Sequence, residues 1–194
     1  SDLLQSIGNS RFHSFVAPIL VETLENITKT STAIACLRSY MQFIELLDKC
    51  GMNSVLPHYF CDDGFLSIMI DTSMELVIEM NTEDVTIMVY ELLCTIIRSC
   101  PEGGVIVAAG ALVDALNVDG GVFKSPEECQ QFVEHVTKCL HQVGLCIQDL
   151  MDQDARNKRA ISNEDTIKTV YEITNIMKIL KNTETFNLWE DILT

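Results

Sequence analysis

The sequence has 194 residues, 47% of them hydrophobic, with only 9 Gly and 4 Pro, a composition that excludes a disordered chain and provides for a sizeable core. Its net charge of −15, carried almost entirely by residues 51–155, repels phosphate groups. This charge excludes nucleic acids and anionic membranes as partners and favours a basic or amphipathic protein segment. No apolar run approaches the ~18–20 residues that span a bilayer.

Apolar residues recur at helical spacing along the chain, and no stretch shows the alternation of a strand. In chain order, helices are predicted over Phe15–Thr28, Thr32–Cys50, Gly64–Glu79, Glu83–Ser99, Val105–Leu116, Pro126–His141, a segment ending at Leu150, Glu164–Leu180 and Thr185–Leu193. The strongest start signal is Ser125, because Pro126 and Glu128 follow it as in a capping box. Ser162 and Asp165 form a second capping pair.

Breaks between these helices are predicted from Gly, Pro and charged residues. The run Pro101–Gly104 should separate two helices, and Gly144 should separate the helix from Pro126 from the next one. Residues 151–160, MDQDARNKRA, are polar and charged and indicate a loop. We therefore expect short helices joined by turns.

One helical segment recurs along the chain. The segment from Asn81 reads NTEDVTIMVYELLCTIIRSC, and the segment from Ser162 reads SNEDTIKTVYEITNIMKIL, with the same acidic start and the same VYE. A further copy begins at Ser125, and a weaker one upstream aligns Tyr40 with Tyr90. A period of roughly 40 residues made of helical units is typical of an α-solenoid.

Two stretches carry a resemblance to a known family: DDGFLSIMIDTSMELVIEMNTEDVTIMVYELLCTIIRSC and VAAGALVDALNVDGGVFKSPEECQQFVEHVTKCL. Each resembles an armadillo repeat, in which a Gly-containing turn precedes a helix, an acidic loop and a long third helix. The resemblance implies an all-α, armadillo-like, right-handed α-solenoid that forms one domain over residues 1–194. About four repeats are expected, at residues 14–61, 62–104, 105–143 and 144–194. HEAT repeats and other armadillo-like domains share this apolar periodicity.

In this family the third helices line a concave groove that binds an extended peptide or a partner helix. The Trp and Asn that many armadillo grooves carry one turn apart are absent at the matching positions here, which argues against a nuclear-import receptor. The resemblance implies a groove with Arg98 as an isolated positive charge. Because exposed charge contacts are weak, Tyr90 and Tyr171 are expected as apolar anchors, with a core position as the alternative for Tyr90. The other groove residues expected are Glu45, Glu91, Thr95, His135, Glu172 and Asn175.

These observations favour a scaffold or adaptor that binds a peptide or helix of a partner protein through an acidic groove. The alternative is a regulatory module of a GTPase or kinase that acts on a folded partner. No arrangement of nucleophile and base indicates an enzyme, and we expect no catalytic residues and no cofactor. The oligomeric state stays open.

The cysteines could in principle bind a metal or react. Cys129, His135, Cys139, His141 and Cys146 crowd one segment, but a structural zinc site usually begins with a closely spaced Cys pair, which is absent here. We therefore expect no metal. The 8 Cys occupy helix-interior positions, which indicates reduced thiols in an intracellular protein, cytoplasmic or nuclear.

Overall fold

The structure is a computed structural model, and it describes residues 22, 26–49 and 65–194. Every regular element in these residues is helical, so the prediction of an all-α chain is confirmed. The elements are α3 (Thr30–Lys49), α4 (Phe65–Met80), α5 (Glu83–Ser99), α6 (Pro101–Leu116), the 3₁₀ turn η3 (Gly120–Val122), α7 (Pro126–Gln153), α8 (Ala155–Ile161), α9 (Glu164–Ile179) and α10 (Thr183–Leu193). Most of the helix expected over residues 15–28 lies outside the described residues, and residues 26–28, which are described, are not helical. None of the described helices is long and apolar enough to cross a membrane.

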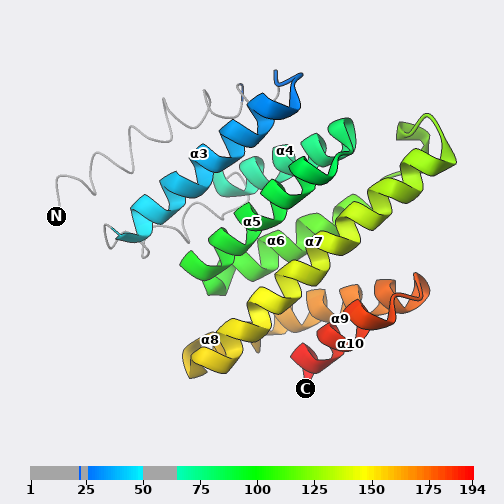
Figure 1. The fold of residues 1–194 in the computed structure, drawn as a ribbon. Coiled ribbons are helices and arrows are strands. Elements are labelled where there is room, and N and C mark those ends of the chain that lie inside the picture. Colours follow the sequence, from blue (N-terminus) through cyan, green and yellow to red (C-terminus); the bar gives the residue numbers. More distant parts are fainter. Residues whose placement is uncertain (1–21, 23–25, 50–64) are drawn as a thin grey trace.

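The helices form two layers (Figure 1). The front layer consists of α3, α5, α7 and α10, since α3 packs against α5, α5 against α7, and α7 against α10. Behind it lie α4, α6 and α9, with α6 packed against both of the others and also against α5 and α7. Apart from the short α8, successive helices alternate between the layers, so each buries an apolar side against the other layer.

The predicted break after Ser99 is present but consists of Cys100 alone, because Pro101–Gly104 belong to α6 rather than to a loop. Proline is tolerated in the first turn of a helix, where its missing N–H has no partner to lose. A Cβ on Gly104 would lie 3.1 Å from both the carbonyl oxygen of Ile96 and the Cα of Ile97. The glycine therefore lets α6 turn back directly onto the end of α5.

The predicted separation at Gly144 is also wrong, because α7 continues through it as one helix. Glycine inside a helix costs only about 1 kcal/mol relative to alanine, and here packing offsets that cost. A Cβ at this position would lie 2.7 Å from Cδ2 of Leu188 and 3.1 Å from Nε1 of Trp189. Gly144 thus marks the place where α10 approaches α7, and the front layer gains its last helix there.

The loop predicted over residues 151–160 is instead the end of α7 and most of α8. Asp154 divides the two helices, because its carboxylate accepts a hydrogen bond from the backbone N–H of Arg156 at 2.8 Å. The polar character of residues 151–160 thus reflects solvent-exposed helices rather than a loop.

The N-cap predicted for α7 is confirmed, whereas the N-cap predicted for α9 is wrong by one residue. The Ser125 hydroxyl accepts a hydrogen bond from the Glu128 N–H at 3.2 Å, as expected for α7. The cap of α9 is Asn163, whose side chain accepts from the Asp165 N–H at 2.8 Å. Ser162 instead donates its hydroxyl proton to the carbonyl of Lys158, within the last turn of α8.

Candidate functional site

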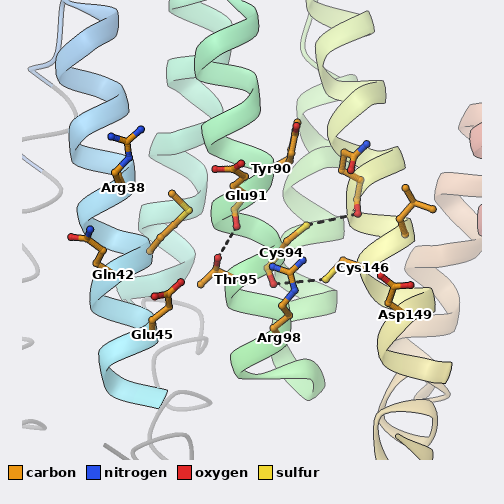
Figure 2. A pocket seen from close by; sticks show the side chains of 13 residues that line it. Arg38, Gln42, Glu45, Tyr90, Glu91, Cys94, Thr95, Arg98, Cys146 and Asp149 are labelled. Atoms are coloured by element: carbon orange, nitrogen blue, oxygen red, sulfur yellow. Dashed lines mark hydrogen bonds between the residues drawn. The ribbon is translucent and has the colours of Figure 1, made fainter. Parts of the chain in front are cut away.

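The outer face of the front layer is hollowed across α3, α5 and α7 (Figure 2). This hollow, called the front trough below, has a volume of about 670 Å³. Its polar and apolar walls come from all three helices, with Met41, Tyr90 and Leu145 as its large apolar side chains. Its charged residues are Arg38 and Glu45 from α3, Glu91 and Arg98 from α5, and Asp149 from α7.

The front trough has mixed charge, whereas the sequence predicted an acidic groove with Arg98 as an isolated cation. Arg38, on α3, is a second cation in the lining of the trough. Within the described residues no ion pair joins these charges to each other, and only Glu45 has an ionic neighbour, Lys49, at 4.0 Å. The trough thus presents charges of both signs to whatever enters it.

The structure brings five of the expected groove residues together in the front trough. They are Glu45, Tyr90, Glu91, Thr95 and Arg98. Thr95 has part of its hydrogen-bonding capacity committed, because its hydroxyl donates to the Glu91 carbonyl at 2.8 Å (Figure 2).

The sequence-based reading missed Arg38, Gln42 and Asp149 as trough residues. Arg38 and Gln42 lie one turn apart on the outward side of α3, in the row that leads to Glu45, so helical spacing contained a signal for them. Asp149 was missed because the helix was expected to end before Gly144.

His135 was expected in the groove but is buried between α7 and α5, with only 4% of its surface exposed. Its Nδ1 lies 3.6 Å from the Glu83 carboxylate, and within the described residues neither ring nitrogen has a hydrogen-bond partner. Burial lowers the pKa of His135 from its ordinary value, and the negative charge of Glu83 opposes part of that shift. His135 is therefore a neutral core residue.

The helix carrying Tyr171, Glu172 and Asn175 was expected to be the fourth helix of the groove. In the structure this helix, α9, belongs to the back layer, and α10 occupies the place beside α7. All three side chains are exposed, but none lines the front trough. The offset that aligns α5 with α9 in sequence thus relates helices of different layers.

A second, smaller hollow of about 270 Å³ adjoins the front trough between α5, α7 and α10. The two hollows share Tyr90 and Gln142, so the depressed surface continues from α3 to α10. In the second hollow Lys138 donates to the Glu83 carboxylate at 2.6 Å, a hydrogen bond that lowers the pKa of Glu83. This ion pair links α5 to α7 within the second hollow.

The burial of His135 predicts a pH dependence of stability. Its ordinary pKa is 6.5, and its folded pKa is lower, so the unfolded chain takes up a proton at a pH where the folded chain does not. The free energy of unfolding is therefore undiminished by this group above pH 6.5, and it decreases as the pH falls from there toward the folded pKa. Each unit of lowering corresponds to about 1.4 kcal/mol.

Urea unfolding at several pH values between roughly 5 and 7 gives the slope of the free energy of unfolding against pH. This slope should be smaller in His135→Gln than in the wild type. The matched control is His141→Gln, on the same helix, where the side chain is only partly buried. Equal slopes in the wild type and His135→Gln would contradict the assignment of His135 as the titrating group.

The cysteines in the described residues are free thiols, at positions 36, 94, 100, 129, 139 and 146. Cys94 and Cys146 are the two that line the front trough. In the same part of the chain no three His, Cys, Asp or Glu side chains are grouped as metal ligands would be.

No protein-family model matches the chain, and no curated protein and no solved structure gives a significant match. The resemblance to armadillo repeats therefore stays an expectation from sequence.

Proposed function

We propose that this chain is a protein–protein interaction module, a scaffold or adaptor, whose front trough receives a helix or an extended segment of a partner protein. The observation that supports it most is the combination of charges of both signs, unpaired with one another, and apolar side chains in one open hollow across three helices. A helix laid into a groove between helices is a common mode of peptide recognition.

The apolar residues of the trough would supply most of the affinity. Met41 and Tyr90 are partly buried and Leu145 is 38% exposed, so each has surface left for a partner to cover. Exposed charge pairs contribute only about 0.5–1 kcal/mol each, whereas buried apolar anchors contribute more. The charges would then set the orientation of the partner and its rate of association.

The mixed charge of the trough also refines the chemistry of the partner. Arg38 and Arg98 call for acidic residues, and Glu91 and Asp149 call for basic ones. We therefore propose an amphipathic segment with both signs of charge, in place of the purely basic segment expected from the net charge of −15. That net charge still favours a basic surrounding surface on the partner.

The test is selection of peptides from a displayed library on the purified chain, followed by titration of a selected peptide by fluorescence anisotropy. Exchanging the trough charges, Glu91→Lys with Arg98→Glu, should weaken binding about tenfold, the loss of two exposed charge contacts. The exchange leaves the net charge unchanged.

The matched control exchanges two exposed charges on the back-layer helix α9, Lys168→Glu with Glu172→Lys, and should leave the affinity unchanged. Circular dichroism checks that both variants keep their helices. Equal affinity of the trough variant and the wild type would contradict the proposed site. If no peptide is enriched but a library of displayed folded domains yields a binder, the second candidate, a regulator of a GTPase or kinase, is favoured.

A further inference from the structure

Two thiols from different helices meet on the floor of the front trough (Figure 2). The Sγ of Cys94, on α5, lies 3.8 Å from the carbonyl oxygen of Gln142, one turn before Cys146 on α7. The Sγ of Cys146 in turn lies 3.8 Å from the carbonyl oxygen of Cys94. Each sulfur thus lies close to the backbone of the helix that carries the other thiol.

Most buried cysteines are small apolar core residues, and Cys139 illustrates that role in this chain. It is fully buried on α7, its Sγ lies 3.9 Å from the Thr86 carbonyl, and it lines neither hollow. Cys94 and Cys146 differ because both form part of the lining of an open trough. Each keeps 5% of its surface exposed, whereas Cys139 has none, so a molecule as small as hydrogen peroxide has access to them from the trough.

The surroundings give the two thiols different proton affinities. The neighbouring Cys146 thiol and burial raise the pKa of Cys94. The neighbouring Cys94 thiol and the positive charge of Arg98 lower the pKa of Cys146, against the effects of burial and Asp149. Figure 2 shows Arg98 beside both cysteines. These directions favour the thiolate of Cys146 over that of Cys94.

We propose that Cys94 and Cys146 form a dithiol site that hydroperoxides oxidise to a disulfide, tying α5 to α7 across the floor of the front trough. The proposal rests on the geometry of the two thiols and does not depend on the binding function proposed above.

The chemistry balances in two steps. The Cys146 thiolate attacks one oxygen of hydrogen peroxide and breaks the O–O bond, which leaves a sulfenic acid and a hydroxide that is protonated to water. The Cys94 sulfur then attacks the sulfenic sulfur and forms the S–S bond. Hydroxide leaves and takes the Cys94 proton, so two thiols and one peroxide give one disulfide and two water molecules. The sulfurs are oxidised and the peroxide oxygens are reduced.

The experiment uses the full chain, first reduced, then freed of reductant and treated with hydrogen peroxide. Without peroxide all 8 Cys should react with an alkylating reagent under denaturing conditions. After peroxide two should resist alkylation. Digestion after Lys, Arg and Glu isolates residues 92–98, in which Cys94 is the only cysteine, and residues 139–156, which contain Cys139 and Cys146. Mass spectrometry should find these two peptides joined.

Three serine variants assign the bond. Cys139→Ser should leave the joined peptides and their rate of formation unchanged, whereas Cys94→Ser and Cys146→Ser should each abolish them. In Cys94→Ser, dimedone should trap a sulfenic acid on Cys146, and this label should be lost in Cys146→Ser. Arg98→Gln should slow disulfide formation several-fold, because it removes the cation that favours the Cys146 thiolate.

Circular dichroism confirms that each variant is folded before oxidation. The proposal is overturned if peroxide produces no bond between residues 92–98 and 139–156, or if that bond persists in Cys146→Ser. It is also overturned if other cysteine pairs form disulfides as fast as this one does, because the trough would then confer no selectivity.

Discussion

Trp189→Ala lowers the free energy of unfolding by about 3–5 kcal/mol, as expected for removal of a large buried aromatic side chain. Trp189 is fully buried where α10 packs against α7, beside Gly144. Its indole N–H donates a hydrogen bond to the Leu140 carbonyl at 3.2 Å, so the variant loses both packing and a buried hydrogen bond. Urea unfolding followed by far-UV circular dichroism measures the loss.

The matched control is Phe186→Ala, three residues earlier on the same helix, where the aromatic side chain is only partly buried. Its loss should be clearly smaller than that of Trp189→Ala. Equal losses would mean that α10 is held to α7 in another way, and that the front layer does not extend to α10 as described.

Ala109→Glu costs about 3 kcal/mol or more, because it places a carboxylate in an apolar core without a partner. Ala108 and Ala109 have no exposed surface on α6, which contacts α4, α5, α7 and α9. The small side chains let these helices approach closely, so no space exists for the larger side chain or for water around its charge. Thermal and urea unfolding report the change.

Gly110→Glu is the control, since it introduces the same charge at the next residue. A Cβ at Gly110 meets nothing within 4 Å, and replacing a helix-interior glycine removes its unfavourable backbone entropy. This variant should be at least as stable as the wild type. Similar losses in both variants would contradict the described orientation of α6 between the layers.

Local sequence signals were sufficient for most helices. Glu83–Ser99 was predicted with the bounds that α5 has, and Ser125 caps α7 as expected. Both depend on interactions within a few residues: apolar spacing on one side of a helix, and a side-chain oxygen that accepts a backbone N–H. Such interactions can be read without knowing what lies on the other side of the helix.

The same local reasoning failed at glycine and proline. Gly104 was assigned to the loop after α5, and Gly144 was predicted to end a helix, although each lies inside a helix where another helix approaches its backbone. A glycine that ends a helix and a glycine that admits a neighbour have the same local signature. Only the contact with α5 in one case and with α10 in the other distinguishes them.

By itself, the sequence determined that the described part of this protein is all-α and where most of its helices lie. The alignment of the repeats with one another and with armadillo repeats also indicated five residues of the front trough, namely Glu45, Tyr90, Glu91, Thr95 and Arg98. Periodicity of about 3.6 residues encodes a buried side, but it carries no information about which helix covers that side.

Tertiary structure alone decided the order of helices in each layer. It placed α10 rather than α9 beside α7, and it removed Tyr171, Glu172 and Asn175 from the trough. The tertiary structure also placed Cys94 and Cys146, which are remote in sequence, together in the lining of the front trough, because α7 continues past Gly144 alongside α5. These outcomes depend on long-range packing of complementary surfaces, which no local pattern of residues specifies.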